Sequence, residues 1–179
     1  MLYVLRLYPS NMNLIVKALP AKKPRTLESQ KVSYMFAVIL IIFLLSQLYS
    51  FDEFLLLVES FWIPGGYVSS QLLASIIVTT ELFALPFLLG MSLSPLMRIC
   101  SMVCCWLAPT IWLLLSIWLN VTTNAVSNIG FLGTTVSLIP GWWTMFFSFA
   151  LVMLSIWASW GLWPFPISKG HLSKQKAEK

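Results

Sequence analysis

Apolar residues lie along this chain in four long blocks, rather than at the short intervals that are typical of a soluble domain. The blocks cover about 32–51, 68–91, 96–119 and 142–163. Each block is long enough to be a transmembrane helix, because roughly 20 mostly apolar residues cross a hydrocarbon core about 30 Å thick. Since short connections make consecutive helices antiparallel neighbours, the pattern predicts an all-α membrane protein, an antiparallel four-transmembrane-helix bundle.

The composition supports the same class of protein. Of the 179 residues, 59% are apolar and 9% are charged, against about 25% charged in an average soluble domain. The sequence contains no Walker loop, no Ser/His/Asp arrangement, no dinucleotide fingerprint and no haem-ligand pair. We therefore set aside the soluble enzyme classes and expect the lipid bilayer to be a main partner of the chain.

Basic residues divide the chain and give it an orientation. A basic arm covers residues 1–31, the transmembrane domain covers 32–163, and a basic tail covers 164–179. All 11 Lys and Arg lie in the arm, in the tail or at Arg98, near the start of the third block. Because basic residues favour the cytoplasmic side, both termini are predicted to be cytoplasmic (N-in/C-in). Topology and anionic lipid then explain the net charge of +5, so we expect no nucleic-acid partner.

Two connections are expected to lie on the outer side of the membrane. In the first, FDEFLLLVESFWIPGG, the residues Phe54, Leu57, Val58 and Phe61 share one face of a helix. This pattern predicts a short helix that lies on the outer surface. The second connection, residues 120–141, carries no charge and is expected to pack against the mouth of the bundle.

One acidic residue, Glu81, lies close to the midpoint of the second block. A charged acid at the bilayer centre costs about 2.5 to 3.5 kcal/mol, and a protonated carboxyl avoids much of that cost. The candidate polar site is Glu81 with the adjacent Thr80, and with Thr110 and Ser155 at similar depth in the third and fourth blocks. In the functional interpretation, Glu81 is a proton carrier or a ligand for a polar headgroup such as that of a quinone. Structurally, it is a neutral acid that donates one hydrogen bond to Thr110 or Ser155, and the residues leave both interpretations open.

Two prolines, Pro86 and Pro109, fall inside the second and third blocks. Each removes a helical hydrogen bond, so we expect a kink in each helix. A kink can open a cavity near Glu81, although kinks without a cavity are also common in membrane helices.

The three cysteines, Cys100, Cys104 and Cys105, all lie in the cytoplasmic half of the third block. Cys100 and Cys104 are one helical turn apart, but that end faces the reducing cytosol, so we expect buried thiols rather than a disulfide. His171 is the only histidine, and no metal site is predicted.

Several motifs of the chain match a known family. The first block is followed by FDEFLLLVESFWIPGG, then by the acid-to-glycine segment ELFALPFLLG (Glu81 to Gly90), and Arg98 opens the third block. With these features the chain resembles the MauE/DoxX group of small four-helix membrane proteins over residues 32–163. The resemblance implies a bundle of four transmembrane helices.

The outer loop resembles that family in part. MauE-like proteins often carry Asn-Cys-Gly-Cys-Phe-Gly before the last helix, whereas this chain reads NIGFLG there. The chain keeps Asn128, Gly130 and Gly133 but lacks both cysteines. It therefore cannot exchange disulfides at this loop, as the family resemblance would otherwise imply.

The resemblance implies a link to methylamine utilisation, where MauE is associated with the maturation or export of a disulfide-rich dehydrogenase subunit. DoxX-like relatives are associated with quinone-linked sulfur oxidation. Because the loop thiols are absent, we expect a non-enzymatic accessory protein without a cofactor in the bacterial cytoplasmic (inner) membrane, with an exported redox-enzyme subunit as partner. The alternatives are a quinone-linked redox subunit that uses Glu81 and a small transporter, against which the lack of an inverted repeat weighs.

Overall fold

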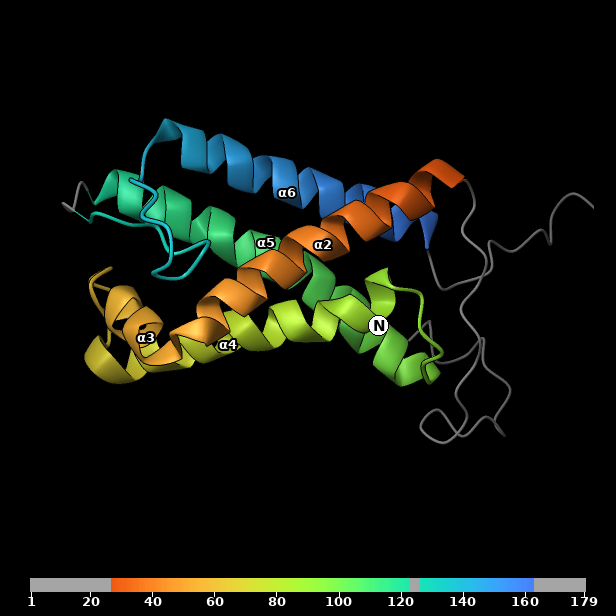
Figure 1. The fold of residues 1–179 in the computed structure, drawn as a ribbon, viewed down its shortest axis with the longest axis horizontal. Helices are drawn as coiled ribbons and strands as arrows, with labels where there is room; N and C mark the ends of the chain where they lie inside the picture. Colours follow the sequence, from red (N-terminus) through yellow and green to blue (C-terminus); the bar gives the residue numbers. More distant parts are fainter. Residues whose placement is uncertain (1–26, 123–125, 163–179) are drawn as a thin grey trace, which may run out of the picture.

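The structure is a computed structural model that describes residues 27–122 and 126–162. These residues form the helices α2 (Leu27–Tyr49), α3 (Phe51–Glu59), α4 (Gly66–Leu88), α5 (Pro95–Val121) and α6 (Trp142–Gly161). Figure 1 shows the four long helices along the long axis of the molecule and α3 at one end. The predicted tail, and the predicted arm up to residue 26, lie outside the described residues.

The helices α2, α4, α5 and α6 are long and apolar enough to cross a membrane, which confirms the four spans predicted from the blocks of apolar residues. Their bounds differ from the predicted ones by a few residues. Within the described residues α2 extends from Leu27, since the polar turn with Glu28 is helical although it does not belong to the apolar block. The second helix ends at Leu88, before Gly90, whose positive φ of 66° ends the helical path.

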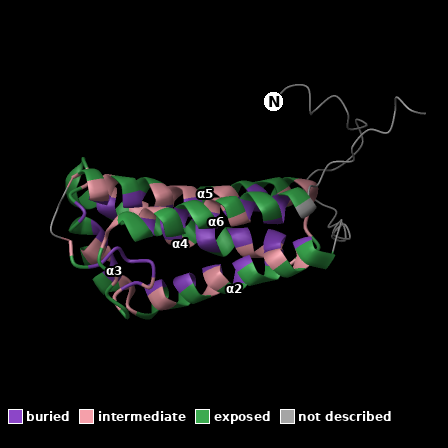
Figure 2. Ribbon diagram, turned by 90° about the horizontal axis from the view of Figure 1, so that it is seen from above, coloured by how far each residue is buried: buried purple, intermediate pink, exposed green. Residues whose placement is uncertain are grey.

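The outward faces of the long helices are apolar. A soluble bundle would expose polar side chains there, whereas a membrane protein exposes its large apolar ones to lipid. Figure 2 shows exposed residues along the whole length of these helices. The large apolar residues among them include Val38, Ile42, Leu45, Leu72, Ile76, Leu107, Leu114, Phe146, Phe149 and Met153. The chain is therefore a multi-pass integral membrane protein.

The long helices pack in a ring, because α2 contacts α4 and α6 while α5 contacts the same two helices. Each follows its predecessor in the opposite direction (Figure 1). Small residues at the contacts let the helices approach closely, as in other membrane proteins. The buried alanines among the described residues are Ala37, Ala74, Ala84, Ala108 and Ala158. Larger buried residues fill the interior between them, among them Phe36, Leu40, Ile77 and Trp112.

One end of the bundle is covered by a structure that we call the cap, which comprises α3 and residues 126–141 (Figure 1). The sequence pattern predicts this short helix, and its residues Phe54 and Val58 are fully buried, as is Phe61 just after its end. The loop 126–141 buries Ile129 and Phe131. The prediction that this loop packs against the mouth of the bundle is therefore confirmed.

The break that Pro86 makes in α4 is filled by a side chain of α5. The Ser101 hydroxyl accepts a hydrogen bond from the Phe87 amide (3.0 Å) and donates one to the Phe83 carbonyl (2.5 Å). In an unbroken helix, that amide would bond directly to that carbonyl. Ser101 thus inserts into the hydrogen-bond ladder and joins α5 to α4 at the break.

Candidate functional site

The side chain of Glu81 lies inside the bundle, where none of its surface is exposed. Its Oε1 atom accepts two hydrogen bonds, from the Trp112 indole nitrogen of α5 (2.8 Å) and from the Gln47 amide nitrogen of α2 (3.3 Å). Its other oxygen, Oε2, is buried and has no hydrogen-bond partner in the part of the chain that the structure describes. The carboxyl thus joins three helices, and both of its donors are electrically neutral.

Gln47 links this carboxyl to the cap. Its amide nitrogen donates a second hydrogen bond, of 3.3 Å, to the backbone carbonyl of Phe131. Its side chain is as fully buried as that of Glu81, and its Oε1 atom likewise lacks a hydrogen-bond partner among the described residues. Glu81, Gln47 and Trp112 are hereafter called the acid cluster.

The ring of Phe131 closes the acid cluster toward the cap. It stacks on Phe43 of α2, with ring centroids 5.6 Å apart and planes inclined by 18°. It also contacts Trp112 of α5 at 4.8 Å and the edge of Phe147 of α6 at 5.4 Å. The ring of this one loop residue therefore contacts α2, α5 and α6, and its backbone carbonyl accepts a hydrogen bond from the Gln47 amide.

The three loop positions singled out by the family resemblance shape the loop that carries Phe131. Asn128 folds the loop: its side-chain oxygen accepts from the amides of Gly130 (3.0 Å) and Leu138 (3.1 Å), and its nitrogen donates to the Gly133 carbonyl (2.9 Å). At Gly133, φ is +57° and an added Cβ would lie 2.6 Å from the backbone oxygen of Ser46. Only glycine allows this close approach of loop and helix.

The other predicted site residues do not join the acid cluster. The hydroxyls of Thr80, Thr110 and Ser155 donate to carbonyls of their own helices, those of Ile76 and Ile77, Trp106 and Val152. The expected hydrogen bond from Glu81 to Thr110 or Ser155 is therefore replaced by bonds to Trp112 and Gln47. The signal for Gln47 was present in the sequence as a lone amide within an apolar block, and burying an amide demands partners.

The three cysteines, in the first half of α5, differ in their exposure. All three are free thiols, with Cys100 exposed, Cys104 half-buried and Cys105 buried. The prediction of buried thiols thus holds for Cys105 and is wrong for Cys100, which lies on the outward face of the helix. Over residues 27–122 and 126–162, no three side chains of His, Cys, Asp or Glu are grouped as metal ligands.

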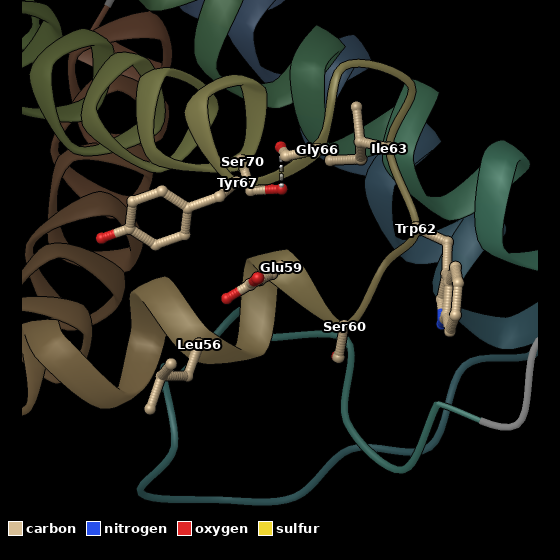
Figure 3. A pocket seen from close by; sticks show the side chains of 8 residues that line it. All are labelled: Leu56, Glu59, Ser60, Trp62, Ile63, Gly66, Tyr67 and Ser70. Carbon is tan, nitrogen blue, oxygen red and sulfur yellow. Dashed lines mark hydrogen bonds between the residues drawn. The ribbon is translucent and has the colours of Figure 1, made fainter.

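A groove of about 680 Å³ lies between α3 and the start of α4. Figure 3 shows Glu59 on the α3 side and Tyr67 and Ser70 on the α4 side, with Trp62 on the connection between them. Trp62 is 77% exposed and has a φ of +54°, which a bulky residue rarely adopts. Its neighbour Phe61 is fixed by its carbonyl, which accepts a hydrogen bond of 3.1 Å from the Trp118 indole.

Comparison of the chain with protein-family models, with curated protein sequences and with solved structures gives no match.

Proposed function

We propose that this protein is an accessory protein of the MauE/DoxX type in the bacterial cytoplasmic membrane. In this proposal the four helices form an antiparallel transmembrane bundle with both termini in the cytoplasm. The cap then lies on the outer side and holds an exported redox-enzyme subunit during its maturation or assembly.

The charges of the described residues support this orientation. Lys31 and Arg98 lie near the starts of α2 and α5, at the end of the bundle away from the cap (Figure 1). The cap itself carries Asp52, Glu53 and Glu59 and no Lys or Arg between residues 126 and 141. Since basic residues favour the cytoplasmic side, the cap is the outer end.

The observation that carries the proposal is that the cap is a packed platform rather than a loose connection. The hydroxyls of Ser50 and Thr134 lie 2.6 Å apart, and Thr134 donates to the Glu53 carboxylate at 2.8 Å. An added Cβ at Gly130 would lie 3.1 Å from Leu57, so the loop rests directly on α3. A surface whose backbone is fixed in advance binds a partner without a large cost of ordering.

The groove of this platform indicates the chemistry of the partner segment. Leu56 and Trp62 provide exposed apolar surface at its rim, and Glu59 provides a negative charge. Large exposed apolar side chains beside a carboxylate suit a segment with apolar residues and a lysine or arginine. We infer that such a segment of the exported subunit occupies the groove.

Site-specific photo-crosslinking from position 62 in intact cells tests the proposal. We expect a crosslink to one exported protein that also purifies with this chain in stoichiometric amount in mild detergent. Glu59→Lys should reduce both signals, because it reverses the charge in the groove, whereas Asp52→Lys on the same helix should not. Recovery of the chain alone, or a crosslink that Glu59→Lys leaves unchanged, would contradict the proposal.

A further inference from the structure

Among the residues that the structure describes, two buried oxygen atoms of the acid cluster have no hydrogen-bond partner, and both are acceptors. They are Oε2 of Glu81 and Oε1 of Gln47, on side chains that already share one hydrogen bond. Buried polar groups in proteins are nearly always paired, so two unpaired acceptors on neighbouring side chains require an explanation. A single proton between them would pair both.

The pattern of donors around Glu81 shows which oxygen would carry that proton. The two donors, the Trp112 indole and the Gln47 amide, both bond to Oε1, and no described residue donates to Oε2. In a protonated carboxyl, one oxygen is a carbonyl acceptor and the other is an O–H donor. Oε1 thus has the surroundings of the carbonyl oxygen, and Oε2 is the position of the hydroxyl.

We propose that Glu81 is protonated on Oε2 and forms a cyclic acid–amide pair with Gln47, and that this proton holds the outer loop closed. In the ring, the Gln47 N–H donates to Glu81 Oε1 and the Glu81 O–H donates to Gln47 Oε1. The second N–H of Gln47 then remains for the Phe131 carbonyl, which it reaches at 3.3 Å. The site binds a proton, and the inference is independent of the accessory role proposed above.

The pairing is complete only when the proton is present. With it, the Glu81 carboxyl and both ends of the Gln47 amide have partners, which a buried polar network requires. Without it, neither oxygen has a donor among the described residues, and we expect the amide to rotate. Rotation takes its N–H groups away from Phe131 and releases the loop that this residue anchors.

Among the described residues, no second ionisable side chain is hydrogen-bonded to Glu81 or Gln47. The groups that face it are the neutral Gln47 from α2, the Trp112 indole from α5 and, through Gln47, the Phe131 carbonyl from the loop. The sequence of α6 contains no ionisable side chain. Apart from Glu81, the described ionisable residues of α2, α3, α4 and α5 are Glu28, Lys31, Tyr34, Tyr49, Asp52, Glu53, Glu59, Tyr67, Arg98, Cys100, Cys104 and Cys105.

Hydrogen exchange of the backbone amides of residues 126–138, followed by mass spectrometry of the full chain in lipid nanodiscs, tests whether the Glu81 proton holds this loop closed. Glu81→Gln is the matched control, because its amide can make the same ring with Gln47 but has no proton to lose. Wild type and Glu81→Gln measured in the same buffer share the intrinsic pH dependence of exchange, so their ratio reports the loop alone. We expect a ratio near one at neutral pH and faster exchange of wild type, by about tenfold, at alkaline pH.

A second variant and a second measurement make the result decisive. Gln47→Met should accelerate exchange of the loop at every pH, while peptides of α5 show that the bundle remains folded. Infrared spectra of wild type at neutral pH should contain the C=O band of a protonated carboxylic acid that Glu81→Gln removes and Gln47→Met shifts. The proposal fails if this band is absent, if Gln47→Met leaves the loop unchanged, or if the exchange ratio is constant across pH.

Discussion

Two buried polar clusters lie one helical turn apart on α5, and they differ in where their partners come from. In the acid cluster, Trp112 bonds to Glu81 of α4, which in turn bonds to Gln47 of α2. In the second, which we call the serine cluster, Ser116 of α5 lies 2.9 Å from the Ser148 hydroxyl of α6. Ser116 also donates to the Trp112 carbonyl of its own helix at 2.8 Å.

This difference shows which of the two clusters can fix the arrangement of the helices. The Ser116 hydroxyl has a partner within α5, so it remains paired even when α6 moves away. The Glu81 side chain, by contrast, accepts its two hydrogen bonds from other helices, from Gln47 of α2 and Trp112 of α5. A wrong register of the bundle would leave its carboxyl buried without donors, which is costly in hydrocarbon. The acid cluster therefore specifies the arrangement, and the serine cluster adds only modest attraction.

The largest expected effect is that of Phe131→Ala, which removes the aromatic ring over the acid cluster. The substitution leaves a cavity among Phe43, Trp112 and Phe147, and such truncations cost about 3 to 5 kcal/mol. We expect a loss of that order in the free energy of unfolding, measured by denaturant titration in mixed micelles. Phe149→Ala is the control, because that ring faces lipid and its loss should change stability far less. Equal losses for the two variants would show that the ring does not seal the cluster.

A smaller loss is expected for Trp112→Phe, which keeps an aromatic ring but removes one of the two donors to Glu81 Oε1. Loss of a donor to a buried acceptor costs about 1 to 3 kcal/mol. Trp143→Phe is the matched control, since Trp143 also donates one hydrogen bond, to the Ile139 carbonyl, but at an exposed position. The same titration should show a clear loss for the first variant and little change for the second. If Trp143→Phe lowered the free energy of unfolding as much, the buried hydrogen bond to Glu81 would contribute no more to stability than an exposed one.

The comparison of the clusters also shows what the sequence could predict. Block length predicts the four spans, because hydrocarbon thickness sets the length of a transmembrane helix. Apolar spacing predicts α3, and the uncharged loop was expected at the mouth of the bundle. These features depend on local sequence and on the solvent around the chain, and both can be read without knowing which helix faces which.

The partners of Glu81 could not be predicted in the same way. Counting residues from the ends of the blocks placed Thr110 at the depth of Glu81, and its true partner Trp112 lies only two positions further along α5. Two positions correspond to about 200° around a helix, so the depth was nearly right and the face was wrong. The rotation of a helix depends on the packing of all its neighbours, and an apolar block without polar periodicity does not encode it.

The smallest expected effect belongs to the serine cluster and completes the comparison. Ser116→Ala removes a hydroxyl that bonds both to Ser148 and to its own helix, and hydrogen bonds between membrane helices average about 0.6 kcal/mol. We expect a loss no larger than this in the same titration. Ser75→Ala is the control, because its exposed hydroxyl donates only to the Gln71 carbonyl of α4. A loss for Ser116→Ala as large as that for Trp112→Phe would contradict this ranking. It would mean that the contact of Ser116 with Ser148 fixes the helix register as strongly as the acid cluster does.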